Sequence, residues 1–98
     1  MEVRPIEELR ATGRMTWIET QRAWVAQPDE IVTALCHSGY HEYKREEARS
    51  GRDRQPAGGV WQGINTATGS VASAVWVNQS GTDAPIVFID IDGEPLRA

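Results

Sequence analysis

The feature that most constrains the fold is a change in the spacing of apolar residues near Val60. Before this point apolar residues recur every three to four positions, which is typical of helices; after it they alternate, which is typical of strands. Residues 60–66 and 71–78 alternate on either side of a short turn, and residues 86–91 form a continuous apolar run. The second half of the chain therefore predicts three antiparallel strands, with 86–91 as the central one.

The first half of the chain predicts helices. Residues 5–12 begin with a proline and acids, which favour the first turn of a helix. Residues 16–27 start with a capping-box pattern and continue with apolar residues at helical spacing. Pro28 suits the start of a third helix, and the polar residues 40–50 are interpreted as its solvated extension.

These elements predict an α+β fold, with two to three N-terminal helices followed by a three-stranded antiparallel sheet. A chain of 98 residues has room for one modest core, so we expect a single domain over residues 1–98. The composition of residues 50–59 predicts a mobile loop, and residues 78–85 predict the turn before the last strand.

Two tryptophans dominate the predicted hairpin. If the turn at 67–70 sets the register, Trp61 lies opposite Trp76, and two large rings beside small neighbours form a shallow platform. Such a platform could bind a protein partner or a flat ligand, while the valines on the other face form the core. The alternative is that the helices cover the tryptophan face and the rings pack as core. The predicted platform consists of Trp61, Trp76, Gly63 and Ala74.

The two histidines of the chain are a candidate metal site. His37 and His41 are four residues apart, so an unbroken helix would place them on one face, where Cys36 could supply a third ligand. Gly39 weakens the expectation of an unbroken helix, and no local pattern supports Cys36 as a catalytic nucleophile. The alternative interpretation is a small thiol beside two surface histidines.

The basic residues between positions 44 and 54 are a candidate nucleic-acid contact. Three helices followed by a hairpin is also the order of a winged-helix DNA-binding domain. The interspersed acids, and a hairpin tip without a basic residue, favour a solvated segment of mixed charge instead. The residues of this alternative are Lys44, Arg45, Arg49, Arg52 and Arg54.

The apolar run at 86–91 continues into Asp92 and Gly93. A hydrophobic strand that ends in Asp-x-Asp-Gly resembles the first motif of haloacid-dehalogenase-type phosphatases, in which the first aspartate is the nucleophile and magnesium assists. The resemblance covers about eight residues, and only five follow Gly93, so we do not expect Asp90 to act as that nucleophile. A strand running into an Asp-Gly turn is also common in its own right, and a weak cation contact at Asp90 and Asp92 is the remaining expectation.

Charge and composition narrow the function further. The net charge of −4 opposes binding to nucleic acids and anionic membranes. A single cysteine cannot form an internal disulfide, and the chain shows no signal peptide or membrane-spanning run, so we expect a small soluble cytoplasmic protein. No cofactor is indicated, and no pair of titratable residues has the spacing that acid–base catalysis requires.

The sequence is therefore interpreted as a non-catalytic binding or interaction protein that engages a protein partner or a small ligand, with a homodimer as a further expectation. A winged-helix-like nucleic-acid-binding regulator and a small metal-dependent enzyme are the alternatives.

Overall fold

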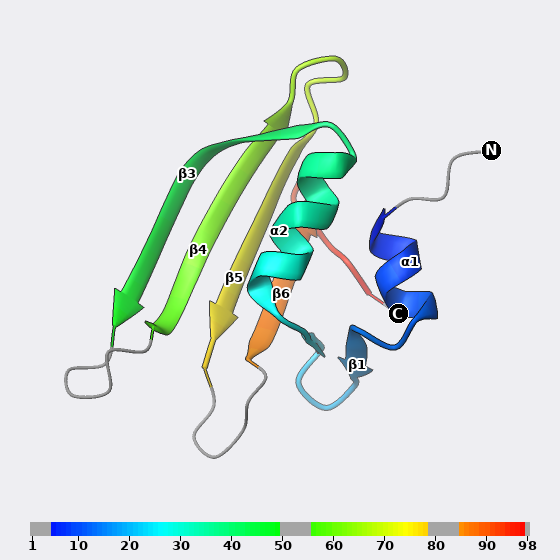
Figure 1. The fold of residues 1–98 in the computed structure, drawn as a ribbon, viewed down its shortest axis with the longest axis vertical. Coiled ribbons are helices and arrows are strands. Elements are labelled where there is room, and N and C mark those ends of the chain that lie inside the picture. The colour runs from blue at the N-terminus through cyan, green and yellow to red at the C-terminus, as the bar shows by residue number, and fades with distance from the viewer. Residues whose placement is uncertain (1–4, 50–55, 79–84, 98) are drawn as a thin grey trace.

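The protein folds as one antiparallel sheet with two helices on one of its faces (Figure 1). The computed structural model describes residues 5–49, 56–78 and 85–97. The sheet has seven strands in the order β1-β2-β6-β5-β4-β3, and β7 pairs with β6 outside this path. The elements are α1 (Pro5–Ala11), β1 (Thr16–Ile18), β2 (Ala23–Val25), α2 (Pro28–His37), β3 (Tyr40–Arg49), β4 (Pro56–Asn65), β5 (Val71–Val77), β6 (Ile86–Ile91) and β7 (Glu94–Pro95).

The expected fold of two to three helices followed by a three-stranded sheet is wrong. Residues 16–25, predicted as helical, form the β1–β2 hairpin, in which Trp17 pairs with Trp24. Two residues seven positions apart share a helix face, but they also face each other across a hairpin, so their spacing does not separate the two structures. Residues 40–49 were also predicted as helical and form β3, an edge strand whose alternating charged residues remain in contact with water.

Two of the predicted helices are confirmed, α1 and α2. In α2 the apolar residues recur at helical spacing, and Ile31, Val32, Ala34 and Leu35 are buried. Pro28 occupies the first turn, as expected for a residue without an N–H group. After the helix, Gly39 adopts φ 103°, a conformation that is sterically unfavourable for residues with a Cβ atom. Glycine therefore allows the chain to turn at this position into β3. Among the described residues, no helix is long and apolar enough to cross a membrane.

The predicted strand at 86–91 is confirmed as β6, but the predicted register of the β4–β5 hairpin is wrong by two residues. Trp61 lies opposite Ala74 rather than Trp76, and Ile64 lies opposite Val71. The turn begins earlier in the chain than expected, because two hydrogen bonds form at Asn65. Its backbone carbonyl accepts the N–H of Gly69 at 2.7 Å, and its side-chain oxygen accepts the N–H of Ala67 at 3.0 Å. A shift of two residues keeps every side chain on the same face.

Two predicted loops extend beyond the described residues. Residues 56–59 of the expected loop belong to β4, and residues 50–55 lie outside the described residues. Of the expected turn at 78–85, residues 79–84 also lie outside them.

The core lies between the helices and one face of the sheet, as the ribbon of α2 across that face indicates (Figure 1). Trp61, Trp76 and Val87 of the sheet pack in one cluster with Ile31 and Leu35 of α2. The core face is therefore the tryptophan face, and the opposite face, which the sequence predicted as core, is left open.

Candidate functional site: the open face of the sheet

The four residues of the predicted platform lie in the core. Trp61 is 0% exposed and Trp76 3%, and both Ala74 and Gly63 are buried. The indole N–H of Trp61 donates to Glu42 at 2.8 Å, which satisfies its one polar group under α2. An exposed platform is therefore wrong, because the helices cover this face and the bulky rings fill the space between the layers.

The histidines do not share a helix face. His37 is the last residue of α2, whereas His41 lies on β3, and the turn at Gly39 separates them. Cys36 is exposed on α2. No group of three or more His, Cys, Asp or Glu residues that could hold a metal ion occurs within the described residues.

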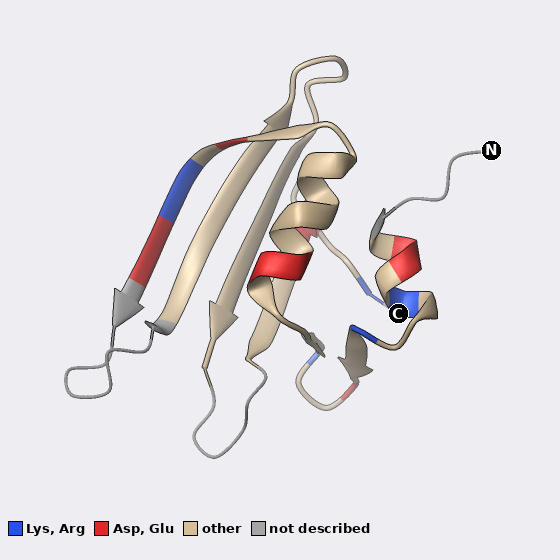
Figure 2. Ribbon diagram, viewed as in Figure 1, with Lys and Arg blue, Asp and Glu red and all other residues tan. Residues whose placement is uncertain are grey.

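The predicted basic segment does not form a third helix, so the winged-helix arrangement is wrong. Lys44, Arg45 and Arg49 lie on edge strand β3, and Arg52 and Arg54 lie outside the described residues. Figure 2 shows acidic and basic residues following one another along this strand.

Arg45 and Lys44 point to opposite faces of β3. Arg45 points toward the helices, where its guanidinium lies 2.8 Å from Asp29 of α2 and 3.1 Å from Glu47. The hydrogen bond that Arg45 donates to the Asp29 carboxylate raises the pKa of Arg45 above its ordinary value, and the hydrogen bond to Glu47 acts in the same direction. The charge of Arg45 thus ties α2 to the edge of the sheet, which leaves Lys44 as the basic side chain of this pair on the other face.

The two aspartates of the Asp-x-Asp-Gly sequence have different positions. Asp92 adopts φ 54° in the turn after β6, and its carboxylate accepts the Ser70 hydroxyl and the Val71 N–H, each at 2.9 Å. Asp92 therefore joins the turn to the start of β5 by hydrogen bonds. Asp90 lies opposite Ser73 on the face away from the helices and is half-buried.

The face away from the helices, called the open face below, is the candidate site. Its most exposed apolar side chains are Val75 at 39%, Val77 at 51% and Phe88 at 43%. Val75 lies opposite both Val60 of β4 and Phe88 of β6, so these three form a continuous apolar row across three strands. No described element covers this row. Exposed apolar surface that spans neighbouring strands is typical of an interaction site.

The open face also carries a row of polar residues across four neighbouring strands. One row beyond the apolar row, Lys44, Gln62, Ser73 and Asp90 lie side by side on β3, β4, β5 and β6. The row thus begins with a base at the sheet edge, passes through two uncharged residues and ends with an acid. The central strands β4 and β5 contain no Lys, Arg, Asp or Glu at all.

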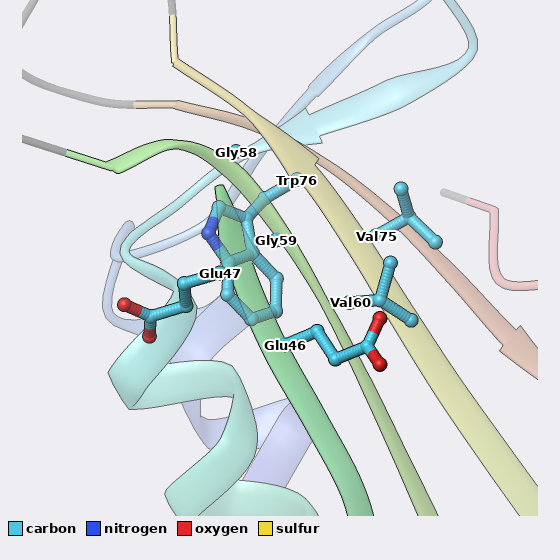
Figure 3. A pocket seen from close by; sticks show the side chains of 7 residues that line it. All are labelled: Glu46, Glu47, Gly58, Gly59, Val60, Val75 and Trp76. Carbon is cyan, nitrogen blue, oxygen red and sulfur yellow. The ribbon is translucent and has the colours of Figure 1, made fainter. Parts of the chain in front are cut away.

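Two hollows adjoin the open face. One, of about 710 Å³, lies at the ends of β3, β4 and β5. Figure 3 shows Glu46, Val60 and Val75 grouped on the open side of it and Trp76 with Glu47 on the other. The second hollow, of about 340 Å³, holds Phe88 and Asp90 together with Arg22 and the Trp17–Trp24 pair. The rings of that pair meet edge to face, with centroids 5.2 Å apart.

Comparisons of this chain with protein-family models, with curated proteins and with solved structures found no match. The open face is therefore the feature of this chain that indicates a function. The sequence did not reveal this face, because the alternating valines of β4 and β5 also fit a buried face. One signal could have identified it. Gln62, Ser73 and Asp90 occupy the same alternating positions as Val60, Val75 and Phe88, whereas Ala72 and Ala74 share alternating positions with the tryptophans. A core face tolerates small residues beside large ones better than it tolerates amide and carboxylate groups.

Proposed function

We propose that this protein is a non-catalytic protein-interaction module that binds another polypeptide through the open face of its sheet. The observation that carries the proposal is the apolar row of Val60, Val75 and Phe88, which spans three central strands and which none of the described elements covers. A sheet needs a second layer to remove such a row from water, and burial contributes about 25 cal/mol for each Å² of apolar surface.

A polypeptide fits this face better than a nucleic acid or a small ligand. The net charge of −4 opposes a phosphate backbone, and on the described open face Lys44 and His41 are the only basic side chains of β3 to β6. The exposed apolar residues extend along a sheet rather than around an enclosed cavity, whereas small-ligand sites are concave. Extended apolar surface with a polar margin is typical of protein–protein contacts.

Site-specific photocrosslinking in cells of the native host tests this proposal. A benzophenone side chain at Val75 places the reactive group in the apolar row, and the same group at Thr33 of α2, which is exposed on the helix side, is the matched control. We expect a discrete protein adduct from position 75 and none from position 33. Equal labelling at both positions, labelling of nucleic acid, or no adduct at position 75 would contradict the proposal.

A further inference from the structure

We propose that the polypeptide bound at the open face is a second copy of this chain, related by a twofold axis that runs parallel to the strands between β4 and β5. The inference rests on the proposed function, because it names the occupant of the same face. It follows from the order of charged and apolar residues across the strands.

The charges of one row are complementary to themselves under this symmetry. The row of Lys44, Gln62, Ser73 and Asp90 has its base on β3 and its acid on β6. A twofold axis parallel to the strands exchanges the two sides of the sheet, so Lys44 of one copy faces Asp90 of the other, twice per dimer. An interface between identical chains must be self-complementary in this way.

The apolar residues obey the same symmetry. The axis stacks β4 of one copy on β5 of the other, which places Val60 against Val75 and Ile64 against Val71. Two sheets packed in this manner lie about 10 Å apart with their strands about 30° from parallel, as in β-sandwiches. Glu46 then faces the row of Phe88, and Arg22 lines the hollow beside Phe88.

The polar and charged residues favour this axis over the other in-plane twofold axis, which runs across the strands. That axis stacks β3 on β3 and β6 on β6. If it passes through the polar row, Lys44 faces Lys44 and Asp90 faces Asp90. If it passes between the two rows, Lys44 faces Glu46, but Gln62 and Ser73 face valines and Asp90 faces Phe88. The first arrangement opposes like charges and the second sets three polar groups against apolar side chains, whereas the axis parallel to the strands leaves only Glu46 against an apolar row.

Sedimentation equilibrium of the full-length chain, with single and paired charge reversals, tests the inference. We expect a dimer that Val75→Lys dissociates, while Thr33→Lys on the helix side leaves it intact. Lys44→Glu and Asp90→Lys should each weaken the dimer at least about tenfold, because each creates two like-charge contacts. The double variant Lys44→Glu/Asp90→Lys should recover most of the affinity. Within one copy β4 and β5 separate these residues, so recovery reports contact between copies.

The outcomes separate this inference from the proposed function. If the wild-type protein stays monomeric at about 0.5 mM, far above a micromolar Kd, a second copy is not the occupant of the open face. The photocrosslinking result at Val75 then still decides whether this face binds another protein. A dimer that persists in Val75→Lys also overturns the second copy as the occupant, since the dimer contact then lies elsewhere, and photocrosslinking at Val75 again decides the proposed function. A dimer dissociated by Val75→Lys in which the double reversal gives no recovery overturns the proposed axis.

Discussion

At the scale of single residues, two glycines make room for the large rings of the core. A Cβ atom at Gly59 would lie 2.3 Å from the ring of Trp76, and one at Gly63 would lie 2.3 Å from the ring of Trp61. Each indole therefore lies over a strand position that has no side chain. This arrangement explains how a sheet of small residues accepts two tryptophans beneath α2 without displacing the helix.

Gly63→Ala should destabilise the protein by about 1–3 kcal/mol, because the indole of Trp61, which supplies the three nearest atoms, must move within a packed core. Denaturant unfolding measures the loss. The control is the same substitution in a Trp61→Leu background, where the smaller side chain leaves space and the added cost should fall well below that in the wild type. An equal cost in both backgrounds would show that the ring is not the obstacle.

Asp92 provides a second prediction at this scale. Asp92→Ala should cost about 1–2 kcal/mol, since it removes the acceptor of two hydrogen bonds and leaves a non-glycine residue at φ 54°. Asp92→Asn should cost less, because asparagine retains one acceptor and tolerates this conformation. The matched control is Glu94→Ala, an exposed acid two residues later, with an expected change within about 0.5 kcal/mol. Equal losses for all three variants in thermal unfolding would contradict this role.

At the scale of elements, the β1–β2 hairpin turns through residues 19–22, and Arg22 adopts φ 50° there. Arg22→Gly should stabilise the protein by about 0.5–1 kcal/mol, because relief of the strained backbone exceeds the entropy that glycine loses on folding. Thr20→Gly, in the same turn without a positive φ, should destabilise it by a similar amount. Loss of stability in Arg22→Gly, seen as a lower Tm, would disagree with the hairpin conformation described above.

The same elements show which parts of the fold are predictable from the sequence. The strand at 86–91 and the helix that begins at Pro28 were recognisable, because a continuous apolar run and a proline before acids each favour one structure. Residues 16–25 were not, since Trp17 and Trp24 satisfy helix and hairpin spacing equally. Residues 40–49 form a strand only because β4 offers a partner, and their composition favours no strand.

The candidate site was harder to predict than the fold. Alternation alone separates the two faces of a strand but does not tell which of them the helices cover. Trp61 and Trp76 could equally have formed an exposed platform, and only their burial under α2 assigns them to the core. The positions of Lys44 and Asp90 in one row depend on three strand registers, and tertiary packing sets those registers.

At the scale of the whole molecule, the sheet joins the two ends of the chain. Strands β3 to β6 pair each with the next in sequence, but β6 also pairs with β2, so Val87 near the C-terminus lies beside Trp24 near the N-terminus. The indole N–H of Trp24 donates to the Leu96 carbonyl at 2.9 Å. The Arg10 guanidinium lies 4.9 Å from the centre of the Trp24 ring and also donates to the carbonyl of Arg97. These contacts join residues that most of the chain separates in sequence, whereas the β4–β5 contacts join residues that only a short loop separates.

Folding kinetics should separate these two kinds of contact. Closing a longer loop costs more entropy, so we expect the β4–β5 hairpin to form before the transition state and the β2–β6 pairing after it. Trp24→Phe, which removes the hydrogen bond to Leu96, should raise the unfolding rate and leave the folding rate nearly unchanged. Ala74→Gly, buried opposite Trp61 in β5, should instead slow folding. Stopped-flow measurements across denaturant give both rates; if Trp24→Phe slows folding as much as Ala74→Gly does, the ends of the chain meet before the sheet is built.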